Sequence, residues 1–423
     1  MNKLIVFIAF FFLSFSVEAQ TSLKACQEAA EKNYPLIQQY DLIQRTTDLT
    51  VANIQKAWLP QLSLSGQSTL QSDVTSWPEG MKGLMSQAGI DLKGLKKDQY
   101  RVGVDLSQVI YDGGSIKNQK EVARQQGNIQ SAQNEVDMYV VRQRVNEMYF
   151  ALLLLNDQIA LNKDLKVLLT GNEEKLASMF KNGTASESDY QSVKAERLNV
   201  EQQLNALLAQ RVTLQRMLSV FCGISIEQVE KPSMEQLDVT NKRPELKLLD
   251  SQIQLADAQE KMLKSNLMPR ISLFAQGFYG YPGYNMFEDM MRHDWSWNGM
   301  VGARFSWDLS ALYTHRNDKV KIQLQRQRVE SMREAFLFNN RLDQIQQNET
   351  LERYRKMMAE DEEIITLRSS VRKAAESKLS HGIIDVNDLV KEINNENTAK
   401  LQRSIHEIEM LKQYYDLKYT TNN

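Results

Sequence analysis

Two short stretches of sequence decide the fold. Trp58-Leu59-Pro60-Gln61-Leu62-Ser63-Leu64 is matched in kind by Leu267-Met268-Pro269-Arg270-Ile271-Ser272-Leu273. In each stretch a proline, which disfavours continuation of a helix, precedes an alternation of apolar and polar residues that is typical of a strand. The two prolines are 209 residues apart. The same helix-to-strand junction is therefore predicted twice in the chain.

Other stretches repeat in the same order. Upstream, Asn33-Tyr34-Pro35-Leu36 corresponds to Lys242-Arg243-Pro244-Glu245. Downstream, Val102-Gly103-Val104-Asp105-Leu106-Ser107 corresponds to Val301-Gly302-Ala303-Arg304-Phe305-Ser306, and Asn182-Gly183 with Asp189 corresponds to His381-Gly382 with Asp388, both at an offset of 199 residues. Ordered matches with one insertion predict an internal twofold repeat. We assign residues 21–221 to the first repeat, 222–242 to an equatorial link and 243–419 to the second repeat.

Composition excludes several classes of protein. The 51 Lys and Arg residues nearly balance the 53 Asp and Glu residues, for a net charge of −2, which argues against nucleic acid as a partner. Two cysteines in 423 residues exclude a disulfide scaffold and a cysteine-rich metal cluster. Beyond residue 20 no apolar run reaches the length of a membrane helix, so a helical membrane bundle is excluded while a β-barrel stays open.

The first residues predict a signal peptide over 1–20. Lys3 precedes an apolar stretch from Leu4 to Val17, and a small residue, Ala19, follows. Fourteen apolar residues are too few for a membrane anchor. A lipid anchor is the alternative, because Leu23-Lys24-Ala25-Cys26 loosely resembles the motif cut before a lipidated cysteine. Cys26 lies nine residues beyond the apolar core, so plain cleavage after Ala19 or Gln20 is favoured.

Four strands are expected, at about 62–70, 101–111, 271–279 and 300–309. Their length suits a tilted membrane strand, roughly 9–11 residues. A half-buried strand of a soluble sheet would alternate in the same way. The positions of the aromatic residues favour a membrane, because rings at strand ends suit the membrane–water interface. The candidate membrane-interface aromatics are Trp58, Tyr111, Trp295, Trp297 and Trp307.

Long helices are predicted over 115–180 and 311–380, which contain no proline. The first would be roughly 99 Å long, a length that indicates a coiled coil. Its apolar residues Val141, Val145, Met148 and Leu152 are spaced by four, three and four residues, as in a coiled-coil seam. Two shorter helices are predicted in each repeat, over 24–57 and 186–221 in the first and over 243–267 and 385–419 in the second. The summed length of each pair is similar to that of the long helix in the same repeat. Each pair is therefore expected to stack end to end beside a long helix.

These features together resemble the TolC family of outer-membrane efflux proteins. The resemblance is carried by Leu59-Pro60-Gln61-Leu62, by Leu106-Ser107-Gln108-Val109-Ile110-Tyr111-Asp112-Gly113-Gly114 and by the segment from Gly183 to Asp189. It implies an α/β membrane protein that forms a homotrimer. Three chains with four antiparallel strands each would build a 12-stranded transmembrane β-barrel, and the coiled-coil helices would continue it as a periplasmic α-barrel.

The resemblance also implies a function. The protein would be the outer-membrane channel of a tripartite efflux pump or a type I secretion system. It would be a passive conduit that a periplasmic adaptor (membrane fusion) protein opens at the periplasmic tip, in series with an inner-membrane transporter. Its expected surroundings are outer-membrane lipid and the periplasm.

The resemblance places the gate and the adaptor contact at two helix turns. The residues concerned are Asn182, Gly183, Thr184, Asp189, Gly382, Asp385 and Asp388. In a trimer Asp388 would form a ring of three carboxylates, which focuses a negative field. Alternatively it is a helix N-terminal carboxylate favoured by the helix dipole. The family pattern has a second acidic residue three positions further on, where this chain has Lys391.

No enzyme, cofactor or metal site is predicted, because no nucleophile–base motif, phosphate loop or His/Cys ligand spacing is present. Met286, Met290 and Met291 could bind a soft metal, but core filling is favoured. A disulfide between Cys26 and Cys222 is one possibility in an oxidising compartment. The rival function is a soluble periplasmic coiled-coil adaptor or scaffold, which would not need strands flanked by aromatic residues.

Overall fold

The computed structural model describes residues 21–235 and 240–422; the predicted signal peptide lies outside the described residues. The chain divides into two compact units. Unit 1 holds Gln133–Lys247 and Arg333–Asn423 with the chain up to Tyr40, and unit 2 holds Asp41–Ala132 and Leu248–Met332. Each unit therefore contains segments of both predicted repeats. The two repeats are interleaved in space although they follow one another along the sequence.

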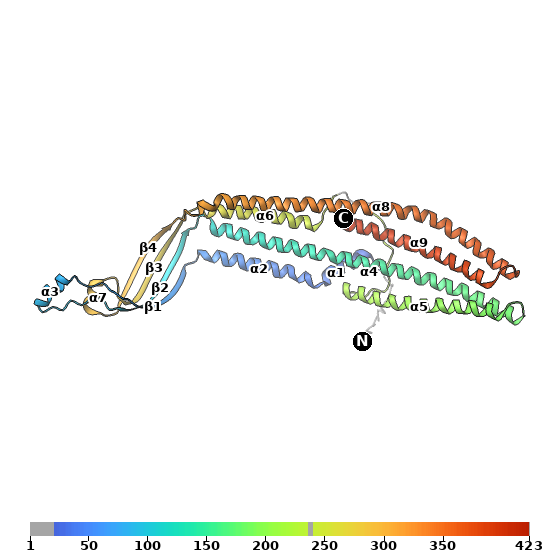
Figure 1. Cartoon of the computed structure of the whole chain (residues 1–423), viewed down its shortest axis with the longest axis horizontal. Coiled ribbons are helices and arrows are strands. Elements are labelled where there is room, and N and C mark those ends of the chain that lie inside the picture. Colours follow the sequence, from blue (N-terminus) through green and yellow to red (C-terminus); the bar gives the residue numbers. More distant parts are fainter. Residues whose placement is uncertain (1–20, 236–239, 423) are drawn as a thin grey trace, which may run out of the picture. The chain divides into compact units, whose positions relative to one another are not determined.

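Unit 2 contains a four-stranded antiparallel sheet in the order β1-β2-β3-β4 (Figure 1). Its strands are β1 (Gln61–Leu70), β2 (Asp98–Tyr111), β3 (Arg270–Tyr281) and β4 (Ser296–Ser306). Strands β2 and β3, one from each repeat, pair at the centre of the sheet. The prediction of four antiparallel strands is confirmed. Strand β4 ends earlier than expected because the Asp308 carboxylate accepts hydrogen bonds from Ser310 (3.0 Å from its backbone nitrogen), in the turn that precedes the next helix.

Long and short helices account for most of the remaining chain. The long helices are α4 (Ser115–Lys181) and α8 (Ala311–Ser380). The shorter ones are α1 (Leu23–Asn33), α2 (Gln38–Gln55), α5 (Glu187–Cys222), α6 (Pro244–Ser265) and α9 (Val386–Thr421), with α3 (Glu79–Gln87) and α7 (Met286–Arg292) between strands. Among the described residues, no helix is both long and apolar enough to cross a membrane.

The expectation of one helix over 24–57 is wrong. Helix α1 ends at Asn33, a 3₁₀ turn follows at Pro35–Ile37, and α2 begins at Gln38. Pro35 lacks a backbone N–H and restricts the preceding residue to extended backbone, and Tyr34 adopts φ −69° and ψ 131°. The proline thus separates two helices that the apolar pattern alone would join.

The core of unit 1 joins α1, α4 and α5 to part of the predicted link. Tyr149 of α4 is fully buried, and its hydroxyl lies 2.8 Å from the backbone oxygens of both Thr21 and Glu230, to which it donates. Ile226 and Val229 of the link pack into the same cluster. Beyond Cys222, which ends α5, the described part of the link is therefore a packed segment without helix.

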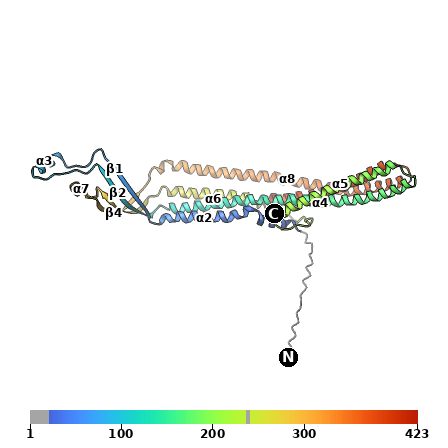
Figure 2. The same cartoon turned by 90° about the horizontal axis from the view of Figure 1, so that it is seen from below.

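A second core of unit 1 lies where two helical hairpins end. Helices α4 and α5 form one hairpin and α8 and α9 form the other (Figures 1 and 2). Their apolar side chains share one buried cluster, so the two hairpins are packed against each other at this end. Its buried members are Leu165, Leu169, Leu176, Val193, Val200, Ala375, Val386, Leu389 and Ile393.

Candidate functional site

One face of the sheet is apolar across all four strands. Residues directly opposite each other in antiparallel strands share a face. Leu62 lies opposite Leu106, Leu106 opposite Ala275, and Ala275 opposite Val301. The neighbouring row is Leu64, Val104, Gly277 and Gly299. This face is open in the single chain, with Leu64 77% and Val301 81% exposed.

The opposite face is polar. One row crosses the sheet as Ser63, Asp105, Gln276 and Met300, and another as Gln67, Arg101, Gly280 and Ser296. Gln276 donates a hydrogen bond to the Asp105 carboxylate, which also accepts one from Ser65 at 3.3 Å. The sheet therefore separates an apolar surface from a mainly hydrogen-bonding one, on which Phe274, Phe278 and Met300 also lie.

Aromatic side chains lie at both ends of the strands. Trp58, Tyr111 and Trp307 are at the end where the helices begin, and all three are exposed. Trp295 and Trp297 are at the other end, where Trp297 contacts Tyr279 with ring centroids 5.0 Å apart. The Trp307 indole N–H donates to the Leu267 carbonyl at 3.0 Å. The rings thus form two belts that border the apolar face.

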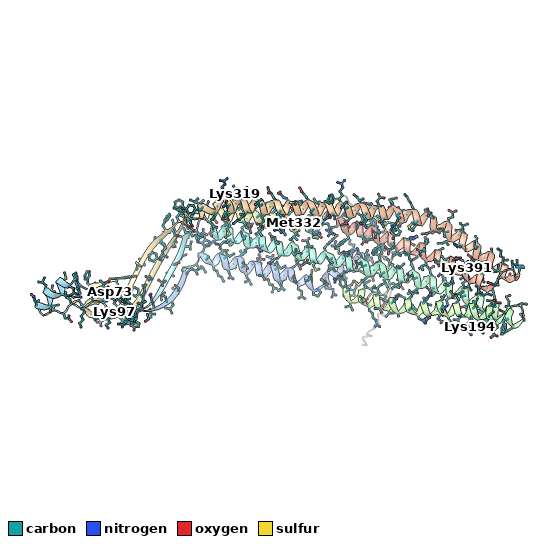
Figure 3. All side chains as sticks on the ribbon, viewed as in Figure 1. Asp73, Lys97, Lys194, Lys319, Met332 and Lys391 are labelled. Carbon is teal, nitrogen blue, oxygen red and sulfur yellow. The ribbon has the colours of Figure 1, made fainter. Side chains whose placement is uncertain are left out.

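The loops beyond the far strand ends are tied to each other. Met290 of α7 is buried with Leu95 and Tyr281, as core filling predicts, whereas Met286 and Met291 are exposed. His293 Nε2 lies 2.7 Å from the Gly94 carbonyl oxygen. Figure 3 labels Asp73 and Lys97 in this region, where the Gln71 N–H donates to the Lys97 carbonyl at 2.9 Å.

The strand-to-helix turn after β2 depends on a residue that the sequence analysis did not single out. The Asp112 carboxylate is buried and accepts hydrogen bonds from the backbone N–H groups of Gly114 (2.9 Å) and Ile116 (2.6 Å), which caps α4. Gly113 has φ +67°, and a Cβ at this position would lie 2.3 Å from Met268 Cβ. Only glycine fits here, because both its backbone angle and its neighbour exclude a side chain.

The two hairpin turns have the same hydrogen-bond pattern. Gly183 (φ +72°) donates to the Phe180 carbonyl at 3.0 Å, and Thr184 donates to that of Met179 at 2.9 Å. In the other hairpin Gly382 (φ +70°) donates to Leu379 at 3.0 Å and Ile383 to Lys378 at 2.9 Å. Each is a Schellman motif, in which a left-handed glycine ends the helix. The sequence match at this offset of 199 residues therefore corresponds to a match in backbone geometry.

Capping explains two of the predicted tip carboxylates. Asp189 and Ser186 form a capping box at the start of α5, since the Ser186 N–H donates to Asp189 Oδ2 (3.1 Å) and the Asp189 N–H to Ser186 Oγ (3.1 Å). Asp385 caps α9 by accepting from the Asp388 N–H at 2.9 Å. Asp388 itself is exposed in the first turn of α9, and Lys391, labelled in Figure 3, follows on the same helix.

Ion-pair networks lie beside both tip turns, and neither was predicted. In the first hairpin Glu173, Arg197 and Glu201 form a chain, with Arg197–Glu173 at 2.5 Å and Arg197–Glu201 at 2.9 Å. Lys166 adds a contact of 2.9 Å to Glu201. The sequence contained a signal for these networks, because Glu173, Arg197 and Glu201 each have an oppositely charged counterpart 199 positions later.

The counterparts Arg372, Glu396 and Lys400 form the second network. Glu396 is only 4% exposed and pairs with Arg372 and, at 2.8 Å, with Lys400. Burial acts to raise the pKa of Glu396, but the hydrogen bonds from Lys400 and Arg372 outweigh it and hold that pKa below its usual value. The Glu376 carboxylate forms a further ion pair with Arg372. The same scaffold position thus carries opposite charges in the two hairpins.

A direct link connects the hairpins. The Asn394 side-chain amide of α9 donates to the Glu196 carboxylate of α5 at 2.9 Å. Together with the shared apolar cluster, this bond holds one hairpin to the other close to the turns. The predicted tip residues are thereby shown to lie at the ends of two connected hairpins.

Known proteins resemble this chain in sequence and in fold. Residues 27–223 match the model of the outer membrane efflux protein family. No curated protein matches the chain. The fold of nearly the whole chain is found in the outer membrane protein VceC of Vibrio cholerae, with a TM-score of 0.68 and 12% identity over 95% of this chain and 96% of that one.

Further solved structures share the fold. The CmeC outer membrane channel of Campylobacter jejuni matches with a TM-score of 0.65 and 11% identity, over 94% of this chain and 85% of that one. The open state of the MtrE outer membrane channel of Neisseria gonorrhoeae matches with a TM-score of 0.64 and 13% identity, over 95% of this chain and 89% of that one.

These matches confirm the resemblance predicted from the sequence. Residues 27–223 are similar to the outer membrane efflux protein family, and nearly the whole chain shares its fold with solved outer membrane proteins. The fold of this chain is therefore the fold of solved outer membrane channels.

Proposed function

We propose that three copies of this chain form a passive conduit that serves a tripartite efflux pump or a type I secretion system. The observation that carries this proposal is the two-sided sheet. Its exposed apolar face, bordered by aromatic belts, suits hydrocarbon, and its polar face suits a water-filled lumen.

The edges of the sheet support a trimer. Among the described residues, β1 pairs only with β2 and β4 only with β3, so one edge of each outer strand is open. Unpaired backbone groups are not tolerated in lipid, and four strands do not close a barrel. Neighbouring copies that add β1 beside β4 would satisfy both edges, giving the twelve strands that the family resemblance implies.

Two lysine substitutions on one strand test the lipid-facing assignment. Leu64→Lys lies on the apolar face and Ser63→Lys, the control, on the polar face; both positions are exposed in the single chain. A lysine at mid-bilayer depth costs about 2–4 kcal/mol in a membrane barrel. We expect Leu64→Lys to lose heat-resistant trimers in the outer membrane and Ser63→Lys to keep them. Equal tolerance of both lysines would contradict the proposal.

We further propose that the hairpin turns are the periplasmic gate and the site where the adaptor docks. Asn182, Gly183, Thr184, Gly382 and Asp388 are exposed at the turns, where a partner has access. The shared cluster and the Asn394–Glu196 bond would hold the hairpins in the closed arrangement. Opening would then separate the hairpins, driven by adaptor binding, since the chain is proposed to act as a passive conduit without its own energy source.

Conductance of the purified trimer in planar bilayers tests the gate. Asp388→Asn and Asp385→Asn remove one carboxylate per chain, and asparagine still serves as a helix cap at Asp385. We expect Asp388→Asn to reduce the preference for cations, while Glu187→Gln, on the other tip turn, serves as the control. Closed-state conductance and selectivity that stay unchanged in both aspartate variants would refute their role in gating.

Site-specific photo-crosslinking tests the partners. A photoreactive residue at Thr184 or Ile383 should capture an exported adaptor with a helical hairpin, and the inner-membrane transporter should copurify with it. The same probe at Tyr313 of α8 serves as the control. Crosslinks of equal yield at Tyr313 and at the turns would contradict docking at the tip.

A further inference from the structure

The only two cysteines of the chain are buried together. Cys26 of α1 is 0% exposed and Cys222, the last residue of α5, is 2% exposed. Both belong to the cluster that contains Tyr149 and Leu218. They are 196 residues apart in sequence, so their meeting is a property of the tertiary fold.

The seam between α1 and α5 is fixed by other contacts. The Asn33 side-chain amide donates to the carbonyls of Val220 (3.1 Å) and Phe221 (3.2 Å) at the end of α5. The rings of Tyr34 and Phe221 lie 5.8 Å apart. Gly223, with φ +70°, ends α5 directly beside Asn33. These contacts hold the two helix segments that carry the thiols.

The two thiols contact each other. Each thiol is a neighbour that shifts the pKa of the other, both lie in the same buried cluster, and both are free in this structure. The hydrogen bond from Cys26 lowers the pKa of the Cys222 thiol, and the same contact with burial raises the pKa of Cys26. The thiolate is the species that undergoes thiol–disulfide exchange, and the fold brings the second thiol close enough to complete it.

We propose that Cys26 and Cys222 form an intramolecular disulfide while the exported chain folds. The proposal rests on the proposed function, because it requires that the helices lie in the oxidising periplasm. The bond would close a loop from residue 26 to residue 222, which contains β1, β2, α4 and α5. It would therefore join the start of the first repeat to the first residue of the link.

The oxidant required is an exported dithiol–disulfide oxidoreductase. The Cys222 thiolate attacks one sulfur of the enzyme's disulfide and releases the other as a thiolate, giving a mixed disulfide. The Cys26 thiolate then attacks the Cys222 sulfur and releases the enzyme's remaining thiolate. Two thiols of this chain lose their protons and two electrons, and the enzyme becomes a dithiol. Because the folded pair is buried, the exchange has to precede the docking of α1 on α5.

Burial of Cys26 also opposes the alternative of a lipid anchor at this residue. A lipidated cysteine carries acyl chains that have to reach a membrane, whereas the Cys26 side chain lies inside the core of unit 1 against Cys222. The two modifications of Cys26 exclude each other. A single experiment therefore separates them.

Thiol counting on the wild-type protein tests the proposal without any variant. The full-length trimer is extracted from outer membranes, unfolded in denaturant and treated with a maleimide-linked polyethylene glycol, with and without prior reduction. We expect no labelled thiol before reduction and two after it. The unreduced chain should also migrate faster in denaturing electrophoresis, because the closed loop is more compact.

Cys26→Ser and Cys222→Ser serve as matched variants, and each should show one labelled thiol before reduction. Two labelled thiols in the unreduced wild type would overturn the proposal and leave the pair as buried free cysteines. A chain with one labelled thiol after reduction and the added mass of acyl groups would overturn it in favour of lipidation. Loss of transport with the disulfide intact would count against the proposed function alone.

Discussion

Replacing Arg372 by methionine tests the buried network of the second hairpin most directly. The substitution keeps most of the volume of the side chain but leaves Glu396, 4% exposed, without its guanidinium partner. Breaking a buried pair costs about 3–5 kcal/mol, and Lys400 still contacts Glu396 at 2.8 Å, so we expect a loss of about 2–3 kcal/mol.

The first hairpin supplies the compensating variant. Arg372→Glu, Glu376→Ala, Glu396→Arg and Lys400→Glu install the residues found 199 positions earlier, at Glu173, Ala177, Arg197 and Glu201, and Ile365→Lys adds the counterpart of Lys166. Because the helices around the two networks are related by the repeat, the transplanted network should restore the free energy of unfolding to within about 1 kcal/mol of the wild type.

Chemical unfolding of the detergent-solubilised trimer, followed by circular dichroism at 222 nm, measures these differences. Arg355→Met is the control, because Arg355 pairs with Glu352 on the exposed side of the same helix, where a pair is worth about 0–1 kcal/mol. A loss for Arg372→Met no larger than for Arg355→Met would refute the reasoning. So would a combined variant that is as unstable as Arg372→Met.

Three further outcomes are expected. Gly113→Ala should destabilise by about 3 kcal/mol, since it combines a positive φ with a 2.3 Å approach to Met268 Cβ, whereas Gly66→Ala, with open space around it, should stay within about 1 kcal/mol in the same unfolding assay. Asp112→Ala should cost about 1–2 kcal/mol, because two backbone N–H groups of the α4 turn lose their acceptor, and amide hydrogen exchange should locate the loss at Gly114 and Ile116. The pKa of Glu396 is lowered in the folded state, so its ion pair contributes stability above the unfolded pKa of the carboxyl, and this contribution is lost as pH falls through the folded pKa. The unfolding midpoints of the wild type and Glu396→Gln should therefore converge in acid and diverge toward neutral pH. A difference between the midpoints that stays constant with pH would contradict the assignment.

Local patterns were sufficient to predict the sheet and the turns. The alternation from Leu62 to Ser65 has a period of two residues, which only a strand places on opposite faces, so four strands could be predicted without tertiary information. Gly183 and Gly382 likewise indicate turns by themselves, because a left-handed residue at a helix end is usually glycine.

Features that depend on tertiary pairing were not predicted. The networks around Arg197 and Arg372 need two helices in register, and a helical face of charged residues does not reveal which partners it will meet. The break at Pro35 was missed because the apolar pattern continues across it. The role of Asp112 depends on a turn geometry that Gly113 and Gly114 permit but do not specify. The interleaving of the repeats into two units depends on β2–β3 pairing, which joins one half to the other.

The strand order has a consequence for how the cylinder could have arisen. Within the chain, the β2–β3 seam joins a hairpin of the first half to a hairpin of the second half. In the proposed ring of three chains, the seam between β4 of one chain and β1 of the next joins two hairpins in the same antiparallel sense. A half-length ancestor with one hairpin could thus have built the same wall from six copies. Gene duplication would then have turned every second subunit boundary into a covalent connection, after which the two tips were free to acquire opposite charges.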